Sequence, residues 1–230
     1  MFLATTIIME MAQSDYSPVR DTISALVWGR FGWAETAAFC LFGLTMAALA
    51  IRLGAIGSRN REARLGQVVL TLIGLSFIVI AIFPTSSPVD PAGIQPQIHR
   101  QTVRAMAALF PLACLFISKG AGPRYRTLRS YSLATAVVAL ALLPAGAVAT
   151  FTDAPWLGAI ERIVLGNGLL WAEALAAQIL LVDRQAFGYE RPRRPVFAHG
   201  LAVPARNEEQ QVSDEEFAAL LKENEIKGTF

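Results

Sequence analysis

The sequence predicts an all-α membrane protein, a bundle of helices that each cross a bilayer. Of its 230 residues 54% are hydrophobic and 17% are charged, and the mean hydropathy is +0.45. A soluble domain is usually about 45–50% apolar and about a quarter charged. The charges also cluster between long uncharged runs, so a soluble fold is disfavoured. The net charge of +2 carries little information, whereas the lack of a basic block argues against a nucleic-acid partner.

Five apolar windows are long enough to span a membrane. A hydrocarbon core of about 30 Å requires about 20 mainly apolar residues in a helix. The windows cover residues 34–56, 65–83, 102–118, 131–151 and 160–182. Five complete spanning helices are therefore predicted, with the lipid bilayer as their environment.

The first 13 residues, MFLATTIIMEMAQ, leave the helix count open. They are apolar but too short to span, they contain Glu10, and they lack the basic start and cleavage site of a signal peptide. They are either an interfacial segment or the stub of a truncated first helix, which would make six.

Three parts of the chain are expected from composition. Residues 1–183 form the transmembrane bundle, and residues 184–212, with prolines and charges but no apolar period, form a cytoplasmic linker. Residues 213–230 form a short amphipathic helix or tail, because Ser213 and Glu216 have capping-box spacing and Phe217 and Leu220 follow at helical spacing. This helix either docks on a partner, lies on lipid, or only solubilises the chain.

The connections predict the orientation, because cytoplasmic loops collect Lys and Arg. One side carries twelve basic residues in its connections: Arg52, Arg59, Arg61, Arg64, Lys119, Arg124, Arg126, Arg129, Arg184, Arg191, Arg193 and Arg194. The other side carries five: Arg20, Arg30, Arg100, Arg104 and Arg162. The 84–100 loop should therefore face outward, and the C-terminus should lie in the cytoplasm.

This topology brings distant polar residues to the outer end of the bundle. Those expected there come from residues 14–35, the 84–104 region and the start of the last helix. The candidate ligand-binding residues are Tyr16, Ser17, Arg20, Ser24, His99, Glu161, Arg162 and Glu173.

Several of these stretches together resemble a known family. "DYSPVRDTISALVWGRFGW" (15–33), a helix with "FGL" (42–44), "AIFPT" (81–85), His99 and "ERIVLGNGLLW" (161–171) are similar to a bacterial membrane family catalogued as domain of unknown function 998. The resemblance covers residues 14–183 and implies a helix bundle in a bacterial inner (plasma) membrane, crossed several times. It implies no established activity. The family pattern normally includes a full first membrane helix, which residues 1–13 do not supply.

One interpretation of the outer residues is catalytic. His99 with Glu161 or an aspartate could exchange protons near neutral pH. Adding Ser24 or Ser17 would complete a set of nucleophile, base and orienting group. No nucleophile-elbow sequence is present, so the catalytic candidates His99, Ser24 and Glu161 define only an alternative, a membrane-embedded enzyme or a proton-linked carrier.

Metal and cofactor sites are not expected. His99 has no second ligand at a suitable spacing. His199 should lie on the opposite side of the membrane, which argues against a haem held by two histidines. Cys40 and Cys114, each inside an apolar run, are typical of core thiols.

The favoured interpretation is structural. Outer charges would join helix ends, for example Arg104 or Arg162 with Glu35 or Glu161, and the same cluster could hold a small ligand, a lipid headgroup or a partner. Glu173 lies 12 positions beyond Glu161, about 18 Å deeper in the membrane. It is either a functional ionisable group or a residue near the inner interface. Whether the protein is an enzyme is left open by the sequence.

Overall fold

The computed structural model describes residues 2–56, 60–86, 93–122 and 125–189, and every regular element in these ranges is a helix. The elements are α1 (Phe2–Met11), the 3₁₀ helix η1 (Ile23–Trp28), α2 (Gly32–Ile56), α3 (Arg61–Ile82), α4 (Ile94–Gly120), α5 (Arg126–Phe151) and α6 (Leu157–Tyr189). Helices α2 to α6 are each long and apolar enough to cross a membrane. The predicted all-α bundle with five spanning helices is confirmed.

The N-terminal segment forms a short helix that does not span. Helix α1 has 10 residues, hence a length of about 15 Å, half the thickness of the hydrocarbon core. Phe2, Thr6 and Met9 are buried on one of its faces. It packs against α2 and η1, so α1 is part of the bundle and lies at one end of it.

Two helices extend beyond their predicted apolar windows. Helix α4 begins at Ile94 instead of near residue 102, so His99 is inside the helix and not in the preceding loop. Gly93 is the N-cap and Pro96 lies in the first turn, where a missing N–H costs nothing. Helix α6 continues to Tyr189, so residues 184–189 of the expected linker are helical. An apolar window locates the part of a helix in lipid and cannot find its polar turns. The remaining linker and the 213–230 tail lie outside the described residues.

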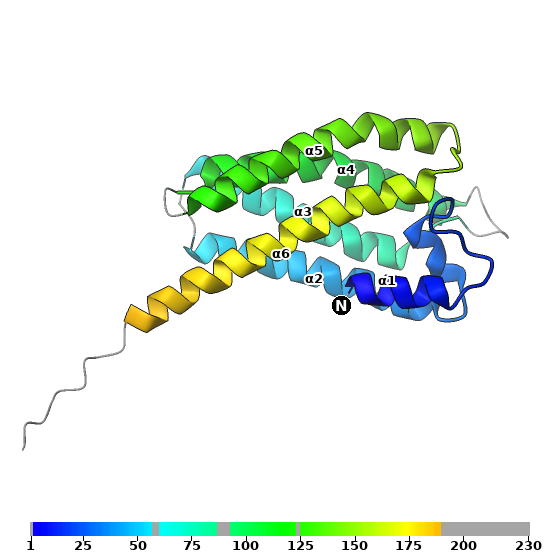
Figure 1. The fold of residues 1–230 in the computed structure, drawn as a ribbon, viewed down its shortest axis with the longest axis horizontal. Helices are drawn as coiled ribbons and strands as arrows, with labels where there is room; N and C mark the ends of the chain where they lie inside the picture. The colour runs from blue at the N-terminus through cyan, green and yellow to red at the C-terminus, as the bar shows by residue number, and fades with distance from the viewer. Residues whose placement is uncertain (1, 57–59, 87–92, 123–124, 190–230) are drawn as a thin grey trace, which may run out of the picture. The chain divides into compact units, whose positions relative to one another are not determined.

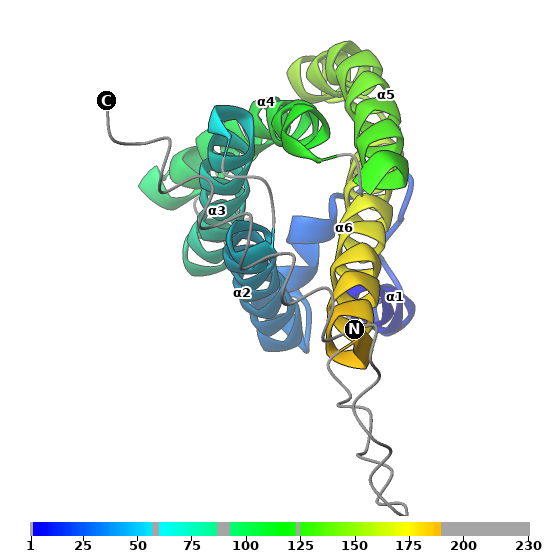
Figure 2. The same ribbon diagram turned by 90° about the vertical axis from the view of Figure 1, so that its left-hand side faces the viewer.

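Helices adjacent in the chain pack on each other. Contacts join α2 to α3, α3 to α4 and α4 to α5, and Figure 2 shows these four helices following one another around the bundle. Helix α6 runs beside α5 and α1 (Figures 1 and 2). The Nε1 of Trp171 on α6 donates to the Ser132 hydroxyl on α5 at 2.9 Å, and both side chains are fully buried. This bond satisfies two polar groups that burial would otherwise penalise.

Small residues permit the close crossing of α2 and α3. A Cβ added to Gly43 would lie 2.6 Å from the carbonyl oxygen of Gly74, and one added to Gly74 would lie 2.7 Å from that of Gly43. Any larger residue at either position would separate the two backbones. Membrane helices use such small-residue contacts because lipid tails are as apolar as leucine and only close packing favours association.

An aromatic cluster fixes α1 on this pair. The ring of Phe2 lies 5.4 Å from the rings of both Phe39 and Phe42 on α2, and Phe42 meets Phe77 of α3 edge-on at 4.8 Å. Such contacts contribute about 0.5–1.5 kcal/mol each beyond the area they bury. The far end of α1 is therefore anchored by apolar packing.

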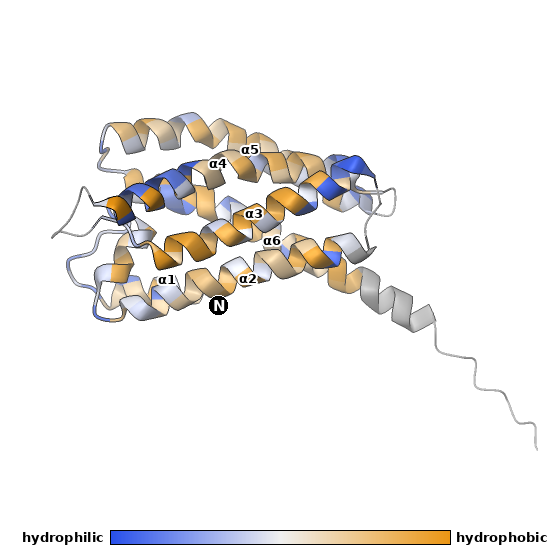
Figure 3. Cartoon of the chain, turned by 180° about the vertical axis from the view of Figure 1, so that it is seen from behind, coloured by the Kyte–Doolittle hydropathy of each residue, from blue (hydrophilic) through white to orange (hydrophobic). Residues whose placement is uncertain are grey.

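The polarity of the residues changes along each helix, from its middle to its ends. Figure 3 shows hydrophobic residues through the middle of the helices and hydrophilic ones toward their ends. Large aromatic side chains are exposed where α2 and α6 begin and α5 ends: Trp28, Phe31, Trp33, Phe151 and Trp156. Aromatic side chains collect at the boundary between lipid and water. This end of the bundle, to which α1 and η1 are attached, has the features of an interface.

Candidate functional site

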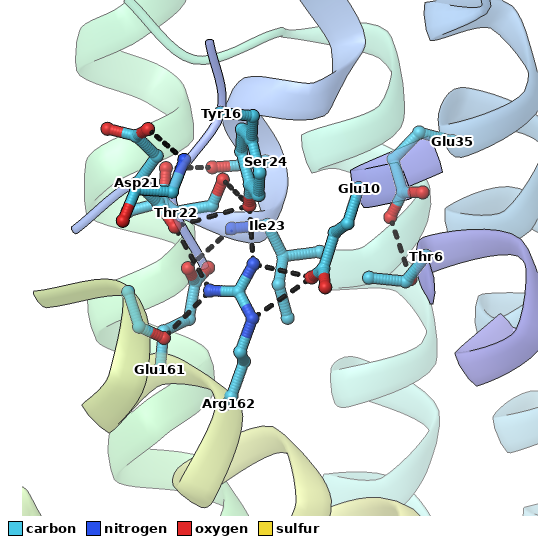
Figure 4. A network of polar contacts seen from close by, with 12 residues as sticks. Thr6, Glu10, Tyr16, Asp21, Thr22, Ile23, Ser24, Glu35, Glu161 and Arg162 are labelled. Carbon is cyan, nitrogen blue, oxygen red and sulfur yellow. Dashed lines mark hydrogen bonds and ion pairs between the residues drawn. The ribbon is translucent and has the colours of Figure 1, made fainter. Parts of the chain in front are cut away.

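The candidate site lies where the first 31 residues meet the start of α6. Helix α1, the 12–22 loop and η1 contribute one wall, and the first turns of α6 contribute the other (Figure 4). The loop lies directly on α6: the backbone N–H of Ala159 donates to the Val19 carbonyl at 2.9 Å. A Cβ on Gly158 would lie 2.3 Å from the Asp21 carbonyl oxygen, so only glycine permits this approach.

Arg162 is the centre of the site. Its Nε and Nη2 both donate to Oε1 of Glu10, its Nη1 donates to the carbonyls of Asp21 at 3.0 Å and Gly158 at 2.9 Å, and its Nη2 donates to the Tyr16 hydroxyl. A guanidinium has five N–H groups. Five hydrogen bonds therefore use its full donor capacity, and four of them end on the N-terminal segment.

Tyr16 supports the guanidinium in two ways. The Cζ of Arg162 lies 5.6 Å from the ring centroid, and the hydroxyl accepts a hydrogen bond from Nη2. The hydroxyl itself faces the carbonyls of Thr22 at 2.9 Å and Asp21 at 3.2 Å, to one of which it donates. Burial raises the pKa of Tyr16 to about 12, and the Arg162 hydrogen bond only partly offsets this rise. The phenol is thus neutral at physiological pH.

Glu161, next in the chain, reaches η1. Its Oε2 accepts the backbone N–H of Ile23, the first residue of η1, at 2.7 Å. The N-cap residue Thr22 makes no side-chain capping bond, so Glu161 satisfies a donor that this helix start leaves open. The Thr22 hydroxyl lies instead 3.3 Å from that of Ser24.

The Asp21 side chain closes the turn before η1. It accepts the backbone N–H of Ser17 at 2.8 Å and the Nε of Arg20 at 3.0 Å. The Arg20 hydrogen bond is the main reason why the pKa of Asp21 is lowered, and the Asp21 carboxylate in turn raises the pKa of Arg20. Arg20 is exposed, so this pair contributes little to stability.

Glu35 adds a buried carboxyl beside the cluster. Its side chain, on the first turn of α2, is fully buried. Its Oε1 is 3.4 Å from the Thr6 hydroxyl of α1, and its Oε2 has no hydrogen-bond partner among the described residues. Glu10, Glu161 and Arg162 are the charged groups that act on it electrostatically. An unpaired buried oxygen of this kind is uncommon in folded proteins.

His99 has a different surrounding from the Arg162 cluster. The imidazole is 4% exposed, and its Nδ1 lies 2.9 Å from the carbonyl oxygen of Phe83, the C-cap of α3. A carbonyl only accepts, so Nδ1 carries a proton and donates to it. His99 thereby joins the end of α3 to the start of α4. Within the described residues, no hydrogen bond links His99 to Ser24 or Glu161.

The remaining predicted residues are distributed as follows. Four of them, Tyr16, Ser24, Glu161 and Arg162, lie where the N-terminal segment meets α6 (Figure 4). Ser17 and Arg20 hydrogen-bond to the Asp21 side chain in the loop before η1. Glu173 is exposed on α6. Arg104 stacks on the Phe151 ring at 5.0 Å, and the ion pairs between described residues do not include the suggested pairings of Arg104 with Glu35 or Glu161. Arg162 pairs with Glu10 instead.

Sequence reasoning missed the two contributions of α1. In the sequence Glu10 argues only against a membrane span, and Thr6 is not among the predicted site residues. A signal was present, because Phe2, Thr6 and Glu10 recur every fourth residue and so share one face of a helix. The spacing indicates the shared face, but it cannot show that Arg162, 152 positions away, lies opposite.

Comparisons with known proteins identify a family and no function. No curated protein and no solved structure matches the chain significantly. A family described as "Protein of unknown function (DUF998)" matches residues 1–178, which is most of the chain and includes α1 and all of the Arg162 cluster. The match agrees with the resemblance carried by residues 14–183. The chain is an integral membrane protein that belongs to this DUF998 family.

Proposed function

We propose that the Arg162 cluster is a clamp that holds the N-terminal segment on the membrane bundle. The observation that carries this proposal is the complete use of the Arg162 donors by Glu10, Tyr16, Asp21 and Gly158. An anionic ligand or lipid headgroup would have to displace one of these acceptors. A binding or structural membrane module is therefore favoured over an enzyme, and the first partner of the cluster is the chain's own N-terminus.

The energetics suit a clamp. Charge-assisted hydrogen bonds contribute about 1.5–3 kcal/mol each when partly shielded from water. The Arg162 and Glu10 side chains are 22% and 16% exposed, so removing one partner leaves the other poorly solvated. Helix α1 is too short to be stable alone in water, because isolated helices below about 12–15 residues are marginal. Its order depends on Glu10 at one end and Phe2 at the other.

The test compares backbone hydrogen exchange in Arg162→Gln with that in Arg20→Gln, both as full chains in lipid nanodiscs. Arg20→Gln is a matched control because it removes an exposed arginine from the same segment. We expect residues 2–11 and 14–28 to lose protection in Arg162→Gln only, while α3 and α4 keep theirs. Equal protection in both variants would show that Arg162 does not hold the segment.

We further propose that the clamp faces outward and that the C-terminus lies in the cytoplasm of a bacterial inner membrane. The excess of basic residues at the opposite end supports this orientation. Ser14 and Lys119 are exposed near opposite ends of the bundle and suit single-cysteine labelling in a Cys40→Ala, Cys114→Ala background. An impermeant maleimide should label Ser14→Cys on intact spheroplasts and Lys119→Cys only after permeabilisation. The reverse pattern would invert the orientation.

A further inference from the structure

The Glu35 carboxyl differs from every other acidic group of the cluster in having no cation or backbone N–H as a partner. Asp21 has Arg20 and the Ser17 amide, Glu10 has Arg162, and Glu161 has the Ile23 amide. Glu35 has only the Thr6 hydroxyl, and its Oε2 is unpaired within the described part of the chain. A fully buried ion in this condition would be very costly.

The Thr6 contact bears on which of the two side chains, Thr6 or Glu35, donates the hydrogen bond between them. A threonine hydroxyl has one hydrogen, and the Thr6 oxygen lies 3.2 Å from the Phe2 carbonyl and 3.4 Å from Glu35 Oε1. The single hydrogen of Thr6 can serve only one of these two acceptors, and the Phe2 carbonyl is the nearer. When the Phe2 carbonyl receives it, the contact with Glu35 is satisfied if Glu35 carries a proton and donates it to the Thr6 oxygen.

The surrounding charges also favour a neutral Glu35. Helix α1 presents Glu10, and α6 presents Glu161 and Arg162. Helix η1 has no titratable side chain, and those of α3 are confined to its first four residues, at the opposite end from its contact with this region. Arg162, the one cation of the described residues that acts on Glu35, has no donor left for it. Two carboxylates and no available donor would oppose ionisation.

We propose that Glu35 is a proton-binding site, occupied when α1 is docked and vacated when α1 leaves. The inference rests on the clamp proposed above, because the same α1 supplies Thr6 over Glu35 and Glu10 to Arg162. Without α1, the Glu35 carboxyl would stand exposed on the first turn of α2, where water and the helix N-terminus both stabilise a carboxylate. The O–H bond of Glu35 then breaks, and the proton passes to water.

Proton binding by Glu35 sets the direction in which pH changes the docking of α1. The docked state binds one proton more than the undocked state, so raising the pH favours undocking by up to tenfold per pH unit. The effect begins near pH 4.3, about where an exposed glutamate ionises, and ends where docked Glu35 itself loses its proton. Glu35→Gln carries no titrating group, so its docking should be independent of pH in this range.

Infrared difference spectroscopy of the full chain in nanodiscs tests proton binding directly. At about pH 6, well above the range in which exposed carboxyls are protonated, the wild-type minus Glu35→Gln spectrum should contain the carbonyl band of a protonated carboxyl. The matched control is Glu62→Gln on the first turn of α3, which should leave the band in place. No such band in the wild type, or its persistence in Glu35→Gln, overturns the proposal.

Two further measurements keep the result decisive. Thr6→Val removes the one hydrogen-bond partner that Glu35 has among the described residues, so the band should shift without vanishing; an unshifted band contradicts the assignment. Hydrogen exchange of α1 between about pH 5 and 8, corrected for intrinsic rates, should show opening that rises with pH in the wild type but not in Glu35→Gln. Protection of α1 without the infrared band would end the proton inference alone, whereas an unprotected α1 would end the clamp.

Discussion

Glu10 and Arg162 lie 152 positions apart and form an ion pair through two donors of one guanidinium. The pair joins a 10-residue helix that is too short to cross a bilayer to α6, the last helix in the described part of the chain that is long enough. Single substitutions measure this link together with the penalty of leaving one partner unpaired, and a double-mutant cycle separates the two.

The cycle of Glu10→Gln and Arg162→Gln should give a coupling free energy of about 2 kcal/mol, because contacting charged residues shielded from water are strongly coupled. The measurement is reversible unfolding in mixed micelles. A parallel cycle of Arg20→Gln and Asp21→Asn should give no measurable coupling, since that pair is exposed. Additive effects at Glu10 and Arg162 would contradict a clamp built on this pair.

Gly158→Ala should displace the 17–22 loop from α6. The added Cβ would lie 2.3 Å from the Asp21 carbonyl oxygen and 2.7 Å from that of Pro18, both of them backbone atoms that cannot rotate away. We expect faster proteolysis of this loop and a lower free energy of unfolding. Gly166→Ala on the same helix meets nothing within 4 Å, and should stabilise slightly through helix propensity, by up to about 1 kcal/mol. Similar behaviour of the two variants would refute the close approach.

Alkaline pH should destabilise the protein through Tyr16. Its pKa is raised from 10 to about 12 by burial, so the folded state keeps this proton while the unfolded state loses it. Stability contributed by neutral Tyr16 is therefore complete below about pH 10 and is lost between about pH 10 and 12. Unfolding measured across this range should show a weaker pH dependence in Tyr16→Phe. The same change at exposed Tyr131 should leave the dependence intact.

His99→Ala should cost about 1–3 kcal/mol of stability, because the Phe83 carbonyl at the end of α3 loses its donor. His99→Asn, whose amide can donate to the same carbonyl, should restore part of this loss. The measurement is again unfolding in mixed micelles. If alanine and asparagine are equally destabilising, the hydrogen bond is not the role of His99, and its chemistry must be sought elsewhere.

The sequence predicts the membrane-spanning helices but not where those helices begin and end. Apolar runs such as 65–83 and 131–151 signal a span because burying an uncharged helix in lipid depends on composition alone. The turn from Ile94 to Gln101 has no such signal, since it contains Gln, Pro, His and Arg. His99, which the sequence places at the end of a loop, is consequently found buried in α4, where it hydrogen-bonds to the end of α3.

What the sequence determined by itself was the class of protein, the number of long spanning helices and the gathering of Tyr16, Glu161 and Arg162 at one end. These follow from local apolar content and from chain alternation across a bilayer. Only the tertiary structure decided that Arg162 meets Glu10, that Glu161 caps η1, and that Thr6 covers Glu35. Such pairings depend on how each helix is rotated about its axis and which neighbour it faces, and packing across the whole bundle sets both.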